Sequence, residues 1–229
     1  MIHRTLAVDR FLSVSQRHYL KDAVIEGCVP FKKAHGRAAY EYMSVDTRFE
    51  GVFDKSMKDH ATLVLTEMLQ AYKGFESFKS VVNVGGGTGA SLNRIITKYP
   101  RINGINFDLP ALVSSAPEYP GIGPSFLPWM GVLPDWSDDR CFDLLKNCYK
   151  ALPEDGVVII VEQILPDEVD TDAAHQSIFH FDLIEAGFNV GKLRTAGELE
   201  TLAKGAGFAG FRPACAVRNH HVIECYKNI

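Results

Sequence analysis

The feature that most constrains the fold of this chain is a buried strand that runs directly into a glycine-rich turn. Residues 80–84 read Ser-Val-Val-Asn-Val, a short β-branched run that is typical of a buried parallel strand. The next five residues are Gly-Gly-Gly-Thr-Gly, and Leu92, Ile95 and Ile96 follow at helical spacing. A strand, a tight turn and a helix in this order predict the first unit of an α/β sheet.

The turn also has the pattern of a nucleotide site. Gly85, Gly87 and Ala90 satisfy G-x-G-x-x-A, and Asp108 follows the next predicted strand, 102–107, about 20 residues on. Glycines let the backbone approach a ligand closely, and a carboxylate at that place accepts hydrogen bonds from a ribose diol. The pattern predicts a ribose-bearing cofactor without separating NAD from S-adenosylmethionine. A glycine-rich turn without a ligand is the alternative.

Helices and strands alternate along the rest of the chain. An apolar stripe from Ala61 to Tyr72 predicts a helix, and shorter helices are expected before it, around 17–25 and 35–42. Thr195 and Glu198 form a capping box that opens a later helix, which stops near Gly205. The remaining expected elements are a strand at 157–165, a helix at 173–187 and an antiparallel pair at 208–217 and 221–226. This alternation predicts an α/β sheet with helices on both faces.

The composition excludes several classes of protein. The chain has 24 basic and 28 acidic residues, so no charge excess favours nucleic acid or an anionic membrane as a partner. Five scattered cysteines without CxxC spacing predict neither a zinc site nor a disulfide framework, and the eight histidines show no metal-ligand grouping. No segment reads as a leader or a membrane span, so we expect a cytoplasmic protein without a metal.

Several separate motifs occur in an order that belongs to one family. They are Val-Asn-Val-Gly-Gly-Gly-Thr-Gly at 82–89, Ile-Asn-Phe-Asp-Leu-Pro at 105–110, Asp-Trp-Ser-Asp at 135–138, Leu-Lys-Asn-Cys-Tyr at 145–149 and Leu-Ala-Lys-Gly-Ala-Gly-Phe at 202–208. From about Tyr19 onward the chain resembles the plant caffeic-acid and flavonoid O-methyltransferases. The resemblance implies cation-independent methyl transfer from S-adenosylmethionine to a phenolic hydroxyl of a phenylpropanoid or flavonoid, with S-adenosylhomocysteine as product.

The resemblance also implies a domain organisation. Residues 76–229 would form a Rossmann-like class I methyltransferase domain, and residues 1–75 a helical remnant of the dimerisation and substrate-lining region. Because most of that region is missing, we expect a homodimer that is weakened.

The catalytic positions depart from the family pattern. The family's base is a histidine directly before the 135–138 motif, and here that position is Pro134, which cannot accept a proton. Of two glutamates that orient the base, one matches Glu162 and the other falls on Leu193. A phenol has a pKa of about 10, and a positioned base contributes ~10²–10⁴-fold to the rate. We therefore expect impaired transfer.

The cofactor site is altered in part. Gly85, Gly87 and Asp108 keep the family's cofactor-binding positions, whereas its lysine falls on Met130 and a usual aspartate is Asn83. A stretch between Ile122 and Asp135 is also missing. The candidate for the central fourth strand is 129–133, flanked by Pro128 and Pro134, so this strand should be short or absent. The third strand lies at the sheet edge, where its loss is tolerable.

The substrate-lining positions survive in part. They match Phe49, Phe53, Met57, Ile184 and Asn189, although their helical spacing alone is equally typical of a core stripe. A family histidine near the ring falls on Met43, and His180 is expected to be a helix histidine without a catalytic role.

Three alternatives stay open at this point. One is a non-catalytic member that binds cofactor or a partner chain, and another is a truncated sequence. The third is an NAD-dependent oxidoreductase, which is disfavoured because no Tyr-x-x-x-Lys pair follows the glycine turn.

Overall fold

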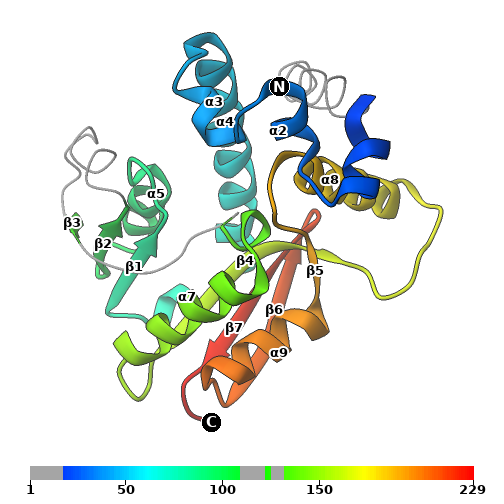
Figure 1. Ribbon diagram of the computed structural model, residues 1–229. Helices are drawn as coiled ribbons and strands as arrows, with labels where there is room; N and C mark the ends of the chain where they lie inside the picture. Colours follow the sequence, from blue (N-terminus) through cyan, green and yellow to red (C-terminus); the bar gives the residue numbers. More distant parts are fainter. Residues whose placement is uncertain (1–17, 109–121, 125–131) are drawn as a thin grey trace. The chain divides into compact units, whose positions relative to one another are not determined.

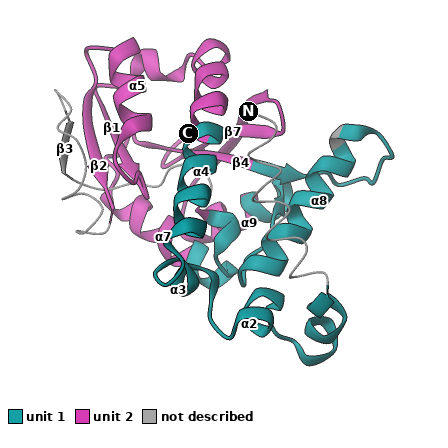
Figure 2. Cartoon of the chain, turned by 90° about the horizontal axis from the view of Figure 1, so that it is seen from above, with its two compact units in different colours: residues 1–60, 133–141, 163–199 teal, residues 61–132, 142–162, 200–229 magenta. Residues whose placement is uncertain are grey.

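The computed structural model describes residues 18–108, 122–124 and 132–229 (Figure 1). The chain divides into two compact units, each built from separated stretches of sequence (Figure 2). Unit 1 comprises residues 1–60, 133–141 and 163–199, and unit 2 comprises residues 61–132, 142–162 and 200–229. The units do not follow the boundary expected near residue 75, since two later stretches join the N-terminal residues in unit 1.

Unit 2 contains the predicted strand, turn and helix. Strands β1 (Ser80–Val84), β2 (Asn103–Phe107) and β3 (Ile122–Pro124) form a parallel sheet in this order. Helix α5 (Ala90–Lys98) packs against β2 and presents Leu92, Ile95 and Ile96 as buried residues. The strand predicted at 80–84 is confirmed, and so is the strand at 102–107 apart from its first residue.

A second sheet has the order β5-β4-β7-β6. It consists of β4 (Val157–Leu165), β5 (Arg194–Thr195), β6 (Gly210–Val217) and β7 (His220–Tyr226), with β6 and β7 antiparallel as predicted. Helices α7 (Asp138–Ala151) and α9 (Ala196–Ala206) lie side by side in Figure 1. Gly205 of α9 makes this possible, because an added Cβ would lie 3.3 Å from the Phe142 ring.

The two sheets differ from the single sheet that the sequence predicts. In the part of the chain that the structure describes, no strand joins β1 to β4. Leu133, the last residue of the candidate fourth strand, belongs instead to the 3₁₀ helix η2 (Leu133–Asp135), and residues 129–131 lie outside the described residues. Val132 and Leu133 are not in a strand, and Pro134 has no N–H to donate to an interior ladder. The third strand, expected to be dispensable, is kept as the short edge strand β3.

The helices at the start of the chain are more numerous than predicted, and the helix predicted at 61–72 already begins at Thr47. Residues 18–26 are helical, and α2 (Pro30–His35), α3 (Ala39–Met43), α4 (Thr47–Ala71) and the 3₁₀ helix η1 (Gly74–Ser77) follow. The helix expected at 35–42 is wrong at its beginning, because Gly36 has a φ of 72° and ends α2. No helix among the described residues is both long and apolar enough to cross a bilayer.

Each unit has its own core. In unit 2, Val64, Leu65 and Met68 of α4 pack with strand residues such as Val161 and Val222. In the same unit the buried Glu224 accepts hydrogen bonds from Tyr72 Oη at 2.6 Å and Arg212 Nε at 2.8 Å, and from the Tyr226 hydroxyl. The core of unit 1 is aromatic and joins α2, α3 and the start of α4 to helix α8 (Ala173–Phe188).

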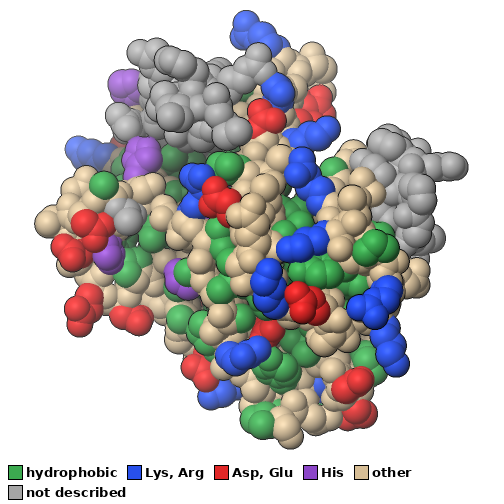
Figure 3. Space-filling view, turned by 180° about the vertical axis from the view of Figure 1, so that it is seen from behind, with side chains coloured by type: hydrophobic (Ala, Val, Ile, Leu, Met, Phe, Trp, Pro, Cys, Tyr) green, Lys and Arg blue, Asp and Glu red, His purple; other side chains and the backbone are tan. Residues whose placement is uncertain are grey.

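The charged side chains are mixed on the surface. On the face drawn in Figure 3, lysine and arginine side chains are interspersed with aspartate and glutamate. This agrees with the balanced composition, which favours no polyanionic partner.

Candidate functional site

The glycine turn of unit 2 has a backbone that only glycine adopts easily. Gly85 has a φ of 65° and Gly87 a φ of 53°, values at which a side chain would be strained. An added Cβ at Gly85 would also lie 2.9 Å from Val132 Cγ2. The predicted glycines are therefore required by the shape of the turn.

Two side chains at the end of β2 hold Gly87 by both of its polar groups. The Gly87 N–H donates to Asp108 Oδ2 at 2.7 Å, and Asn106 Nδ2 donates to the Gly87 carbonyl at 3.0 Å. The structure thus brings together Gly85, Gly87 and Asp108, the three residues predicted to bind the cofactor. The Asp108 carboxylate fixes the turn through this hydrogen bond.

Asn106 is a residue of this site that sequence reasoning missed. It is the register partner of Asn83 across β1 and β2, and both side chains are buried. Asn83 Nδ2 donates to Asn106 Oδ1 at 3.0 Å. Two buried amides on adjacent strands, each one residue before the carboxyl end of its strand, are the signal that marks this pair.

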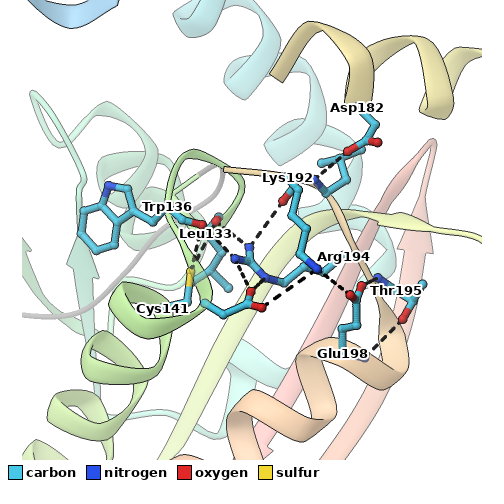
Figure 4. A network of polar contacts seen from close by, with 10 residues as sticks. Leu133, Trp136, Cys141, Asp182, Lys192, Arg194, Thr195 and Glu198 are labelled. Atoms are coloured by element: carbon cyan, nitrogen blue, oxygen red, sulfur yellow. Dashed lines mark hydrogen bonds and ion pairs between the residues drawn. The ribbon is translucent and has the colours of Figure 1, made fainter. Parts of the chain in front are cut away.

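In unit 1 a buried arginine holds the segment around Pro134, the residue predicted to occupy the base position (Figure 4). The Arg194 guanidinium donates to the Leu133 carbonyl at 2.7 Å, the Trp136 carbonyl at 2.8 Å and Asp138 Oδ1 at 2.8 Å. Its planar fork of donors suits three acceptors at once. Sequence reasoning also missed Arg194, since a single arginine carries no pattern.

Pro134 and Leu193, the two positions predicted to depart from the family pattern, are both apolar and buried. Pro134 lies in η2, and its carbonyl is so close to the backbone of Gly191 that an added Cβ there would lie 1.7 Å from it. Leu193 is 1% exposed, and its backbone N–H donates to Asp182 Oδ1 at 2.9 Å. Neither side chain can take or give a proton. Glu162, the one residue predicted to keep its catalytic position, is buried in β4 and belongs to unit 2.

Asp135 directly follows Pro134, and its carboxylate is hydrogen-bonded to two other residues of unit 1. Asp135 Oδ2 accepts a hydrogen bond from Tyr40 Oη at 2.6 Å, and Oδ1 accepts one from Asn189 Nδ2 at 2.8 Å. Burial raises the pKa of Asp135, although the hydrogen bonds that its carboxyl group shares with Tyr40, Asn189 and Glu185 partly oppose this shift. Burial and the nearby carboxylate also raise the pKa of the Tyr40 hydroxyl.

Most predicted substrate-lining residues lie in the aromatic core of unit 1. Phe53 stacks on Phe188 with 5.6 Å between ring centroids, and Phe49 lies 6.2 Å from Phe53. Ile184 belongs to the same cluster, and Asn189 binds Asp135 as described above. Met57 differs, because it is 46% exposed. Met43 is buried in this cluster, and His180 is exposed on α8.

One group of metal-ligating side chains occurs among the described residues. Asp170, Asp172 and His175 have ligand atoms within 4.8 Å of one another, before and at the start of α8. Asp172 accepts from the His175 backbone N–H at 2.9 Å, so helix capping explains the arrangement without a metal.

A comparison with models of protein families shows the family to which the chain belongs. A model of the O-methyltransferase domain matches residues 17–131 and 125–209. The chain belongs to this family. The match is split near residues 125–131, in the stretch where the resemblance predicts missing residues.

Similar proteins within this family come from plants. The chain is 49% identical over 225 residues to caffeic acid 3-O-methyltransferase 1 of Populus tremuloides, covering 92% of this chain and 61% of that protein. It is 46% identical over 236 residues to caffeic acid 3-O-methyltransferase of Medicago sativa, covering 96% and 64%. The chain therefore spans less than two thirds of the length of these relatives.

Solved structures support the same fold at lower identity. Human N-acetylserotonin methyltransferase in complex with SAM matches with a TM-score of 0.81 and 20% identity, over 95% of this chain and 68% of that one. LaPhzM matches with a TM-score of 0.82 and 23% identity, over 97% and 72%. The fold is that of the O-methyltransferases, which confirms the fold expected from the sequence at this level.

Proposed function

We propose that the chain binds S-adenosylmethionine at the glycine turn and methylates a phenolic hydroxyl of a phenylpropanoid or flavonoid. The observation that carries the proposal is the hydrogen bond from the Gly87 N–H to Asp108 Oδ2, at 2.7 Å, in a turn whose glycines have positive φ. A backbone that would clash with any Cβ at Gly85 suits close approach of a ligand. The cofactor supplies the methyl group, and the ribose hydroxyls donate to Asp108.

The transfer step is slow in this proposal. Pro134 and Leu193 leave two of the three catalytic positions without a titratable side chain, so Glu162 has no base to orient. Loss of the base alone lowers the rate by about 10²–10⁴-fold. The lack of a titratable side chain at Pro134 and Leu193 also favours the second candidate, a non-catalytic member of the family that binds the cofactor without turnover.

The phenol-binding surface is proposed in unit 1. Phe49, Phe53 and Ile184 supply apolar contact for an aromatic ring, and Asn189 supplies a polar group. We further propose that residues 1–75 belong to a dimerisation and substrate-lining region preceding the methyltransferase domain at 76–229, that the protein forms a homodimer, and that it is cytoplasmic.

Calorimetric titration with S-adenosylhomocysteine and with NAD tests the cofactor assignment. We expect measurable binding of S-adenosylhomocysteine, and a loss of about 1.5–3 kcal/mol in Asp108→Ala, the scale of a hydrogen bond to a charged group. Asp108→Asn is the matched control, because its amide oxygen still accepts the Gly87 N–H while the charge is lost. Tighter binding of NAD than of S-adenosylhomocysteine would contradict the proposal.

A further inference from the structure

The carboxylate of Asp135 already accepts a hydrogen bond from a phenol, and this phenol is a side chain of the protein itself. Tyr40 of α3 donates from Oη to Asp135 Oδ2 at 2.6 Å. The Tyr40 ring meets the Phe188 ring edge-on, with 6.0 Å between the ring centroids and 67° between the ring planes. A carboxylate for the hydroxyl and an aromatic neighbour for the ring are the contacts that a phenolic substrate needs.

These contacts lie beside the surface proposed for the phenol. Phe188, which contacts Tyr40, also stacks on Phe53 with 5.6 Å between the ring centroids. Asn189 donates from Nδ2 to Asp135 Oδ1 at 2.8 Å, so it binds the same carboxylate as Tyr40. All of these residues belong to unit 1. The Tyr40 hydroxyl therefore occupies an acceptor next to the proposed phenol-binding surface.

The Tyr40 side chain can leave this position without the unfolding of α3. The helix is anchored by Ala39 and Met43, whose exposed fractions are 1% and 7%. Tyr40 itself is 52% exposed, although burial is the largest cause of the raised pKa of its hydroxyl. The ring is thus open to solvent while the hydroxyl is enclosed. Rotation of this side chain into solvent breaks the hydrogen bond to Asp135 and the ring contact with Phe188.

We propose that Tyr40 competes with the substrate, so that a phenol binds unit 1 by displacing the Tyr40 hydroxyl from Asp135. The inference rests on the proposed function, since it concerns the phenol-binding surface of that function. It makes Tyr40 a specificity-determining residue, because a ligand must donate a hydroxyl of its own to replace the hydrogen bond that is broken. An aryl methyl ether has no hydroxyl to donate, so Asp135 does not stabilise it.

This competition lowers the apparent affinity of the protein for phenols. A ligand binds more weakly in proportion to the fraction of the protein in which its site is free. The hydrogen bond of a hydroxyl to a charged group changes an equilibrium constant by at least about tenfold. Tyr40→Phe removes the hydroxyl and keeps the ring, so it frees the Asp135 carboxylate without opening a cavity beside Phe188.

The test compares the binding of caffeic acid and of its dimethyl ether, dimethoxycinnamic acid, by equilibrium dialysis. The two ligands share the ring and the acid group and differ in their hydroxyls. We expect Tyr40→Phe to bind caffeic acid about tenfold more tightly than wild type and the dimethyl ether within about twofold of wild type. Tyr42→Phe is the matched control, because Tyr42 lies on the same helix and donates to another aspartate, Asp46, at 3.5 Å. Its affinity for both ligands should equal that of wild type.

An NMR measurement on wild type follows the displacement directly. With ¹³C at the Cζ of tyrosine, the Tyr40 signal is assigned by its absence from Tyr40→Phe. It should move toward the position of a water-exposed tyrosine when caffeic acid is added, and stay in place with the dimethyl ether.

Several results would overturn the inference. They are a Tyr40 signal that caffeic acid does not move, equal or weaker binding of caffeic acid by Tyr40→Phe, the same gain for both ligands, and the same gain in Tyr42→Phe. Failure of both wild type and Tyr40→Phe to bind caffeic acid also overturns it, because a freed Asp135 would then bind no phenol. If wild type fails to bind S-adenosylhomocysteine, the proposed function fails, while the response of Tyr40 to caffeic acid still decides the inference.

Discussion

Replacing Arg194 with methionine tests how the segment around the base position is held. The substitution keeps an unbranched apolar stem and removes all of the guanidinium donors. It leaves the carbonyls of Leu133 and Trp136 without their charged partner, while Asp138, whose side chain is 56% exposed, regains water. The cost therefore comes from the two carbonyls more than from the ion pair.

The expected loss in the free energy of opening the segment in Arg194→Met can be worked out from these contacts. A hydrogen bond to a charged group contributes about 1.5–3 kcal/mol, and the exposed end of the ion pair adds little. The Cys141 thiol, at 3.4 Å from the Leu133 carbonyl and 3.7 Å from the Trp136 carbonyl, offers a weak replacement. We expect Arg194→Met to lower the free energy of opening this segment by about 3 kcal/mol, which is roughly 10²-fold in the open population.

Alkylation of Cys141 reports this opening directly. Cys141 is fully buried and contacts the segment, so its labelling rate, followed by mass spectrometry of its peptide, should rise about 10²-fold in Arg194→Met. Cys148, which is buried in unit 2, should label at an unchanged rate. Lys192→Met is the matched control, because Lys192 is an exposed cation of the same segment and its loss should cost less than about 1 kcal/mol. Unchanged labelling of Cys141 in Arg194→Met would refute the reasoning.

Three further predictions concern packing, pH and catalysis. Gly191→Ala should lower the free energy of unfolding in urea by about 1–3 kcal/mol, because its Cβ would meet the Pro134 carbonyl, whereas Gly197→Ala, with its nearest neighbour at 3.9 Å, should change it little. Burial raises the pKa of Glu224, but hydrogen bonds from two tyrosines and an arginine outweigh it and hold the pKa below the ordinary 4.5. Its contribution to stability is thus present above that pH and is lost as the pH falls, so Glu224→Gln should flatten the acid limb of a stability–pH curve. Pro134→His with Leu193→Glu should restore more methyl transfer than either change alone, and additive effects would speak against a shared role.

Local patterns in the sequence predicted the elements that depend on few residues. The β-branched run at 80–84 is β1, and 157–165 is β4. The capping box is present in both directions, since the Thr195 N–H donates to Glu198 Oε2 at 2.9 Å and the Glu198 N–H to Thr195 Oγ1 at 3.2 Å. Each depends on periodicity or on side chains three residues apart, which a sequence displays directly.

The features that sequence reasoning missed depend on tertiary contacts. Arg194 is buried because carbonyls from a distant segment surround it, and nothing adjacent in the sequence indicates this. Asn106 can bind both Asn83 and Gly87 because the register between β1 and β2 places it opposite Asn83. Pro134 led to the prediction that the fourth strand is short or absent. The sequence did not predict that Leu133 lies in a 3₁₀ helix, because that depends on the folded backbone.

The most direct test of the central proposal, an O-methyltransferase whose transfer step has lost its base, is the transfer of a labelled methyl group to caffeic acid. Wild-type chain at saturating S-adenosylmethionine should turn over about 10²–10⁴-fold more slowly than a relative with a histidine at the position of Pro134. Turnover within tenfold of such a relative would contradict the account, because another group would then have to take the proton of the phenol.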